Sequence, residues 1–361
     1  MNLLKIGIAQ GDINGIGYEM ILKTFFNEEM LSLCTPIIYG SPKVATYHRK
    51  GLNIPTNFQI IPSAQQARDG VLNMVNCFGE EDIKIELGKS TPESESSSAI
   101  ALAKAMEDLS NGSINALVTL PIYNNLVKSG DTQTDQSLYI QNILNSEKKA
   151  LNMLNYNGLR ISFVTSNVPV SKISEGITKE SVAEKIVQLH NSLKRDFAID
   201  NPRIAVLALN PNFEEMETSE EKDVIIPVVE ELFKRGVRCM GPYVAEKLFA
   251  NDTYKCFDAI LAMYHDQGVI PFHSIANEEG YKFVASLPAV VTAPICDTMY
   301  EIAGKGATNE TTLRHAIYAA IDIVRNRFRF DQARRNPLKK QYFEKRDDSD
   351  KLKLDQVTEE A

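Results

Sequence analysis

The chain has 361 residues, of which 43% are apolar and 24% are charged, as is typical of one large or two medium globular domains. The net charge of -8 argues against a general affinity for nucleic acid, and no basic stripe with interleaved aromatic residues offsets it. The start has no signal-peptide pattern and no apolar run approaches the roughly 18 residues of a membrane span, so we expect a cytoplasmic protein with neither nucleic-acid nor membrane partners.

Short β-rich runs alternate with amphipathic ones along most of the chain, and this alternation predicts an α/β protein with a largely parallel sheet. The expected strands span residues 4–9, 35–40, 116–119, 161–164, 203–208 and 259–263. The expected helices cover residues 18–26, 99–109, 228–232 and 313–324, and a capping-box pattern at residues 218–221 opens the third of them.

The stretch from residue 331 to residue 361 is rich in charged side chains and poor in apolar ones. This composition predicts a frayed helix or a disordered tail, with an interaction tail as the alternative. The five cysteines are scattered and form no CxxC pair, so we expect neither a structural zinc site nor a disulfide framework.

A glycine-rich turn, Gly11-Asp12-Ile13-Asn14-Gly15-Ile16-Gly17, joins the first expected strand to the first helix. Glycines there let the backbone turn tightly or approach a ligand, and the following helix N-terminus can attract an anion. The pattern differs from GxGxxG, so it does not predict a Rossmann dinucleotide site. A tight turn and an anion site both remain open from the pattern.

Polar residues follow several of the apolar strands. Met263-Tyr264-His265-Asp266-Gln267-Gly268 places a His-Asp pair at one strand end, where it could bind a metal or act as an acid and base. Leu209-Asn210-Pro211-Asn212 and residues 118–121 end two other strands, which indicates one shared cleft. The glycines of residues 302–306 could hold a phosphate or form a plain loop.

Together these segments resemble the 4-hydroxythreonine-4-phosphate dehydrogenase family of vitamin B6 synthesis. The family's Gly-Asp-Pro-x-Gly-Ile-Gly is similar to residues 11–17, its Tyr-His-Asp-Gln-Gly matches residues 264–268, and its Leu-Asn-Pro matches residues 209–211. Residues 88–90 and 302–304 also agree, and the resemblance extends over roughly residues 4 to 325.

The resemblance implies a fold like that of isocitrate and isopropylmalate dehydrogenases, with a cleft between two α/β/α domains. We expect the first domain to comprise residues 1–125 together with 262–330 and the second to comprise residues 126–261. It also implies a homodimer, NAD as the cofactor, and oxidation of a phosphorylated hydroxy amino acid followed by loss of carbon dioxide. Three histidines, one of them from the other subunit, hold a divalent metal in the family.

The chain departs from the family at these metal positions. His265 stands at one ligand position, whereas Gln136 and Asn212 stand where the family has the other two histidines. Amide oxygens are poorer ligands than imidazole for such an ion, so we do not expect a catalytic zinc site. The family's Arg in a substrate-binding segment is replaced by Val291, and a later His by Cys296.

The resemblance also assigns roles to the remaining candidates. Catalytic chemistry is expected from His265, Asp266, Asp12 and Glu246; substrate binding from His273, Lys282, Gln136 and Ser137; and cofactor binding from Thr298, Gly304 and Lys305. These residues fit a diverged NAD-linked dehydrogenase acting on another small hydroxy acid. The alternative is a non-catalytic homologue that binds a ligand or forms a heterodimer with an intact paralogue, to which it lends His265. Survival of the family reaction with altered ligands is the least favoured interpretation.

Overall fold

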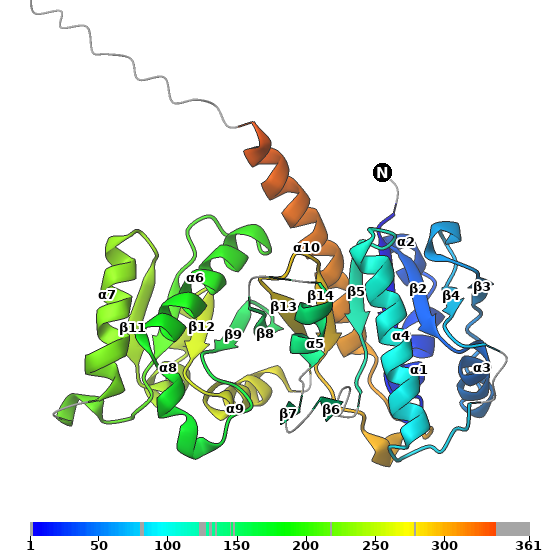
Figure 1. Ribbon diagram of the computed structural model, residues 1–361, viewed down its shortest axis with the longest axis horizontal. Coiled ribbons are helices and arrows are strands. Elements are labelled where there is room, and N and C mark those ends of the chain that lie inside the picture. Colours follow the sequence, from blue (N-terminus) through cyan, green and yellow to red (C-terminus); the bar gives the residue numbers. More distant parts are fainter. Residues whose placement is uncertain are drawn as a thin grey trace, which may run out of the picture.

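The computed structural model describes residues 3–79, 83–122, 128–129, 132–133, 136–144, 146, 149–216, 219–277 and 279–336 (Figure 1). The strands are β1 (Lys5–Ala9), β2 (Thr35–Gly40), β3 (Gln59–Ile61), β4 (Asn73–Asn76), β5 (Ala116–Thr119), β6 (Lys128–Ser129), β7 (Thr132–Gln133), β8 (Leu151–Tyr156), β9 (Leu159–Phe163), β10 (Ile204–Leu207), β11 (Cys239–Tyr243), β12 (Ala259–Ala262), β13 (Tyr281–Ala285) and β14 (Val291–Pro294). The helices are α1 (Gly17–Phe26), α2 (Met30–Leu33), α3 (Pro42–Gly51), α4 (Pro92–Ser110), α5 (Gln136–Ile143), α6 (Lys179–Arg195), α7 (Ile226–Lys234), α8 (Ala245–Ala250), α9 (His265–Ala276) and α10 (Thr311–Arg335).

One sheet runs through the whole molecule in the order β11-β10-β12-β9-β8-β13-β14-β5-β1-β2-β4-β3. Its described strand pairs are parallel except for the three that involve β8 or β13 at the centre, namely β8 with β9, β8 with β13 and β13 with β14. The predicted α/β class and largely parallel sheet are therefore confirmed. The division at residues 125/126 and 261/262 stays a prediction.

The antiparallel centre begins with a hairpin that our sequence analysis missed. Asn157 and Gly158 join β8 to β9, and both have positive φ, +43° and +89°. Asn-Gly is the preferred pair for a two-residue turn whose twist matches the flanking strands. The dipeptide was thus a readable signal for this hairpin.

Apolar side chains on the two faces of the sheet pack against different helices. On one face, the core contains residues of α1, α6, α7 and α10. On the other face, α4 packs over the β1–β2–β5 region, α5 contributes Ile140 to the same cluster, and α8 and α9 pack over β9, β10 and β12. The molecule therefore has three layers, with α9 and α6 on opposite sides of β9.

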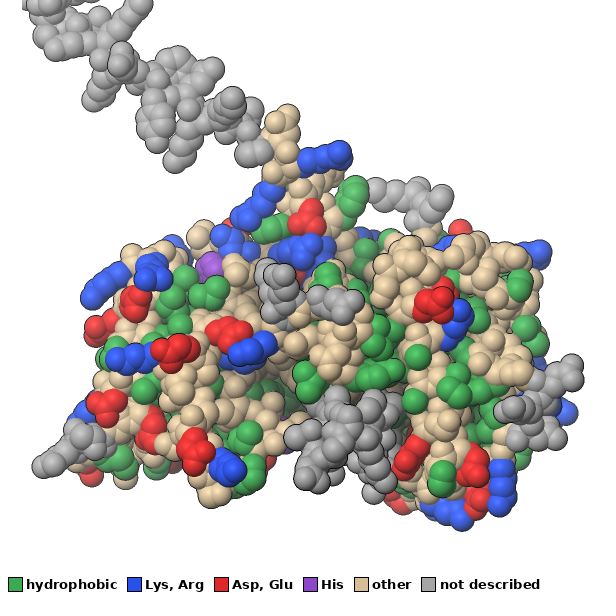
Figure 2. Space-filling model, viewed as in Figure 1, with side chains coloured by type: hydrophobic (Ala, Val, Ile, Leu, Met, Phe, Trp, Pro, Cys, Tyr) green, Lys and Arg blue, Asp and Glu red, His purple; other side chains and the backbone are tan. Residues whose placement is uncertain are grey.

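Helix α10 is longer than predicted. It runs on through residue 335, so the first residues of the expected tail are helical, while residues 337–361 lie outside the described residues. Ion pairs to α6 explain the extension, because Arg327 bonds Asp196 and Arg195 bonds Asp331. Figure 1 shows the end of α10 projecting from the body, and Figure 2 shows basic side chains gathered where it leaves.

The helix predicted around residues 228–232 is confirmed as α7, but its start differs. A π-helical turn, Glu221–Ile225, precedes α7, and Ser219 Oγ accepts a hydrogen bond from the Lys222 amide at 3.3 Å. Thr218 of the expected capping box lies outside the described residues. Within the described part of the chain, we find no helix with the length and apolarity of a membrane span.

Candidate functional site

The N-terminus of α9 presents the His-Asp pair to solvent. His265 Nδ1 lies 2.8 Å from Asp266 Oδ1, and the two side chains are 51% and 68% exposed. The imidazole stacks on the ring of Phe163 at the end of β9, with ring centroids 5.8 Å apart. The contact with Asp266 occupies Nδ1, so Nε2 is the nitrogen that the imidazole can offer to a ligand.

The next two residues of the motif are structural. Gln267 Oε1 accepts a hydrogen bond from the Met263 amide at 2.8 Å, and Gln267 Nε2 donates to the Ala208 carbonyl at 2.6 Å. Gly268 lets α9 approach β9 closely, since a Cβ there would lie 2.6 Å from Phe163 Cε1. These contacts fix α9 against the ends of β10 and β12 and so hold His265 in place.

The segment after β10 is held by acidic residues that our sequence analysis did not select. The Asn210 amide donates to Glu221 Oε1 at 2.7 Å, and its side-chain Nδ2 donates to Glu220 Oε2 at 2.9 Å. Glu221 is fully buried at the start of the π turn. Asn210 is therefore anchored, whereas Asn212 two residues later is exposed. Glu220 and Glu221, which are adjacent just before the expected helix, were the feature of the sequence that could have indicated this anchor.

Asp12 in the glycine-rich turn is an anchor within the fold. It is 1% exposed, and its carboxylate accepts hydrogen bonds from the Asn14 amide at 2.8 Å, Ser94 Oγ at 3.1 Å and the Tyr300 hydroxyl at 2.7 Å. Burial and the bond to Asp12 together raise the pKa of Tyr300. Its expected catalytic role stays a prediction, although these three donors occupy much of its hydrogen-bonding capacity.

The glycines around Asp12 meet neighbouring backbone at short range. A Cβ on Gly15 would lie 2.9 Å from the Thr298 carbonyl oxygen, and one on Gly17 would lie 2.4 Å from the Gln10 carbonyl oxygen. Gly11 has a φ of +70°. Of the two interpretations left open by the sequence, a tight turn explains all three glycines, and the Ile16 amide donates to the Thr298 carbonyl at 3.3 Å across this contact.

The expected cofactor residues lie on the segment that packs against this turn. Thr298 is buried, Gly304 has a φ of +73°, and Lys305 is exposed. Two residues of α1, which the sequence analysis did not select, hold the end of the segment. Lys23 Nζ donates to the carbonyls of Gly306 at 2.7 Å and Thr308 at 2.9 Å, and the Thr308 amide donates to Glu19 Oε1 at 2.8 Å.

Glu19 and Lys23 form an ion pair at 2.9 Å one helical turn apart. Burial by itself would raise the pKa of Glu19, but hydrogen bonds from Lys23 and Thr308 hold it below its usual value. Gly304 and Gly306 both have positive φ and flank the exposed Lys305, and the cofactor-binding role of this segment stays a prediction.

The expected substrate residues lie on separate elements. Lys282 is exposed on β13. Glu246, which was expected to be catalytic, is exposed in the first turn of α8, and its role stays a prediction. His273 lies in the last turn of α9, eight residues and roughly 12 Å along the helix axis from His265. His273 and His265 therefore cannot bond the same atom of a substrate, and the binding roles stay predictions.

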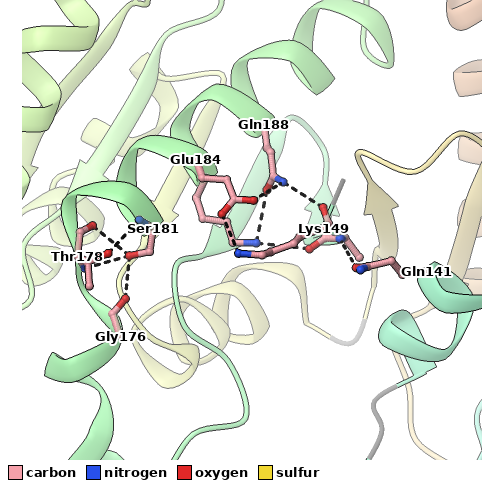
Figure 3. A network of polar contacts seen from close by, with 9 residues as sticks. Gln141, Lys149, Gly176, Thr178, Ser181, Glu184 and Gln188 are labelled. Atoms are coloured by element: carbon pink, nitrogen blue, oxygen red, sulfur yellow. Dashed lines mark hydrogen bonds and ion pairs between the residues drawn. The ribbon is translucent and has the colours of Figure 1, made fainter. Parts of the chain in front are cut away.

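Gln136 and Ser137 begin α5, which a polar network connects to α6. Ser137 Oγ donates to Asn152 Oδ1 at 2.7 Å. The Ala150 amide donates to Gln141 Oε1 at 2.7 Å. The preceding residue, Lys149, forms an ion pair with Glu184 at 3.2 Å (Figure 3). Figure 3 shows how this network bridges from α5 to the middle of α6.

The donor set does not fit the family's divalent metal. Among the described residues, no three His, Cys, Asp or Glu side chains lie close enough to hold an ion. His265 is the one imidazole at the expected ligand positions, where the other two residues are the amides Gln136 and Asn212. We therefore derive no reaction step through a metal.

Comparisons with known proteins show the family to which the chain belongs. The family model described as pyridoxal phosphate biosynthetic protein PdxA matches residues 32–320. The chain belongs to the PdxA family. A 4-hydroxythreonine-4-phosphate dehydrogenase of Bacteroides thetaiotaomicron is 48% identical over 99% of both chains.

More distant PdxA relatives share the fold. A crystal structure of a 4-hydroxythreonine-4-phosphate dehydrogenase from Burkholderia phymatum is 25% identical, has a TM-score of 0.72, and covers 90% of this chain and 99% of its own. A putative D-threonate 4-phosphate dehydrogenase of Oceanobacillus iheyensis is 29% identical over 88% of this chain and 97% of its own. The resemblance found in the sequence is thus confirmed.

Proposed function

We propose that this PdxA homologue is an NAD-dependent oxidoreductase that oxidises a small hydroxy acid other than the family's phosphorylated hydroxythreonine. The observation that carries the proposal is the His265–Asp266 pair, 2.8 Å apart at the N-terminus of α9. Asp266 orients the imidazole through Nδ1, so Nε2 can accept the proton of a substrate hydroxyl.

NAD would supply the acceptor for the hydride on the carbon that bears this hydroxyl. Thr298, Gly304 and Lys305 would hold it on the segment that Glu19 and Lys23 fasten to α1. His265 Nε2 would take up the hydroxyl proton as the hydride is transferred. The alcohol therefore becomes a carbonyl without a build-up of negative charge on oxygen that a metal would have to stabilise.

A change of substrate is supported by residues that differ from the family. Val291 and Cys296 stand where the resemblance places an Arg and a His, so an anionic group bound by a bidentate Arg would lose its partner. The relative named for D-threonate 4-phosphate supports the view that this fold serves more than one hydroxy acid.

The test is NADH formation by the purified protein with a panel of phosphorylated and unphosphorylated four-carbon hydroxy acids. We expect turnover of at least one of them, insensitive to chelators, and a loss of roughly 10²–10⁴-fold in kcat for His265→Ala. Glu246→Gln is the comparison variant. Glu246 is also exposed, and the resemblance also assigns it a catalytic role. Turnover of 4-phosphohydroxythreonine in preference to the others, or activity abolished by chelation, would contradict the proposal.

A second candidate function follows from the exposure of His265. A side chain that is 51% exposed at a helix start is accessible to a second subunit. In this alternative, the chain forms a heterodimer with an intact paralogue and contributes His265 to the partner's metal site. Co-purification with such a paralogue and metal binding by the heterodimer, lost in His265→Ala, would support it. A strict homodimer would exclude it.

A further inference from the structure

A cavity lies on the face of the sheet opposite α9. Its volume is about 300 Å³, and its walls come from the β8–β9 hairpin, β13, the end of α6 and α10. Cavities of this size accommodate small ligands. Its polar and aromatic lining includes Asn155, Arg160, Phe197, Tyr281 and Asp322.

Strand register explains why the floor of this cavity is polar. Asn155 on β8 lies directly opposite Arg160 on β9 and Tyr281 on β13, so the three side chains form one row on one face of the sheet. The next row on the same face has Met153 paired with Phe283, both fully buried in the core. That next row also contains the buried Ser162 opposite Met153, so the polar row lies beside a mostly apolar one.

Asn155 leaves a hydrogen-bond acceptor without a partner. Its side chain is 2% exposed and donates from Nδ2 to the Met153 carbonyl at 3.0 Å. Its Oδ1 atom has no hydrogen-bond partner among the residues that the structure describes. The Oδ1 atom has no accessible surface, so it is a buried polar atom beneath the cavity floor and not a contact for a ligand.

Arg160 supplies a positive charge next to that acceptor. Its Nη1 donates to the carbonyls of Gly158 at 3.0 Å and Asp258 at 3.1 Å, and the guanidinium lies 4.5 Å from the centre of the Phe197 ring. The Asp258 carboxylate instead bonds Arg203. Burial lowers the pKa of Arg160. A largely buried guanidinium held by backbone carbonyls attracts an anion, whose charge would offset this desolvation.

The cavity is separated from His265 by the sheet itself. Arg160 points to the face covered by α6 and α10, whereas Ile161 and Phe163 on the same strand point to the face covered by α9. His265 stacks on Phe163 on that second face. A ligand beside Arg160 therefore cannot contact His265, and the cavity is a distinct site.

We propose that this cavity binds a small zwitterion of amino-acid size. Its anionic group pairs with Arg160, and its ammonium group pairs with the exposed carboxylate of Asp322 on α10, which lines the same cavity. The aromatic wall of Phe197 and Tyr281 accommodates the carbon skeleton. The proposal does not depend on the proposed oxidoreductase activity.

The test is titration of the full-length protein with L-serine, L-threonine and L-phenylalanine, followed by ligand-observed NMR. We expect saturable binding of at least one, and binding at least about tenfold weaker in Arg160→Gln and Asp322→Asn. Acetate and methylammonium, each carrying one of the two charges, should not compete at the same concentrations. The matched control is Arg203→Gln, which removes a half-exposed arginine on the other side of Asp258, and His265→Ala is the control for the α9 site.

Hydrogen exchange of the unmodified protein provides a second readout that requires no variant to fold. Binding should protect amides in residues 155–160 and 315–326 and leave those around His265 unchanged. No saturable binding at millimolar concentrations, equal binding by the two cavity variants with unchanged thermal midpoints, or loss of binding in His265→Ala would each overturn the proposal.

Discussion

His48 is a buried residue whose protonation opposes folding. It is 2% exposed, its Nε2 lies 2.9 Å from the Ile13 carbonyl oxygen, and its ring stacks on Tyr18. Burial lowers its pKa, although the bond to Ile13 and the nearby charge of Glu19 act in the opposite direction. The glycine-rich turn that contains Asp12 is therefore attached to α3 through a neutral imidazole.

We predict a pH dependence of stability from this shift. The unfolded chain takes up a proton at His48 near its ordinary pKa of about 6.5, whereas the folded chain resists protonation until lower pH. The free energy of unfolding should have its full value at pH values above this ordinary pKa, and it should fall as the pH decreases below it. Thermal midpoints measured from neutral to mildly acidic pH should show this fall, and His48→Gln should reduce it. His273 is exposed, so His273→Gln should keep the wild-type dependence of the thermal midpoint on pH. The same pH dependence in both variants would contradict the assignment to His48.

At the scale of elements, the position of the His265–Asp266 pair depends on how closely α9 packs on β9. Gly268 makes this possible, since a Cβ would meet Phe163 Cε1 at 2.6 Å and Ile161 Cγ2 at 2.7 Å. Both contacts are with side chains of the core, where movement is restricted by packing.

We predict that Gly268→Ala lowers the free energy of unfolding by roughly 1–3 kcal/mol through overpacking, despite alanine's higher helix propensity. It should also lower kcat in any reaction that uses His265, because α9 must shift. Gly51→Ala is the matched control, since Gly51 also lies in a helix but a Cβ added there would have no heavy atom within 4 Å. That variant should be stabilised by about 0.5–1 kcal/mol. Denaturant unfolding measures the free energy of unfolding of both variants. The same change in both would disprove the argument that packing limits Gly268.

At the scale of the whole molecule, α10 connects distant parts of the sheet. It packs on β14, β5 and β13, and Arg327 donates to the carbonyls of Leu287 and Pro288 in the turn between β13 and β14. The same guanidinium donates from Nε to Asp196 Oδ1 at 2.6 Å at the end of α6. This buried ion pair fixes α10 to α6 at one end of the cavity beneath α10, which Asp196 lines.

We predict that Asp196→Asn destabilises the protein by roughly 3–5 kcal/mol, because it leaves Arg327 buried without its counter-charge. The adjacent pair Arg195–Asp331 joins the same two helices but is 37% and 55% exposed. Asp331→Asn should therefore cost less than about 1 kcal/mol. Urea unfolding of the two variants compares the same substitution in a buried and in an exposed ion pair. A similar loss of unfolding free energy in both would show that burial does not determine how much these ion pairs stabilise the protein.

Much of the fold could be predicted from the sequence because several strands are fully buried. The strands at residues 35–40, 116–119 and 259–262 appear as continuous apolar runs, which is the pattern of a sheet covered on both faces. β8 was missed because its Asn152 and Asn155 interrupt that pattern. The early start of α4 was also missed, although Thr91 and Ser94 form a capping box there.

The sequence by itself determined the family, the α/β class and the His265–Asp266 pair, because these depend on local patterns and neighbouring residues. Tertiary structure decided what the polar residues do. Asp12 is an anchor because Ser94 and Tyr300, distant in the chain, bond its carboxylate. Arg160 and Asn155 form a cavity floor because strand pairing places them opposite each other beneath α10. Such contacts depend on register and packing between elements, which no local pattern specifies.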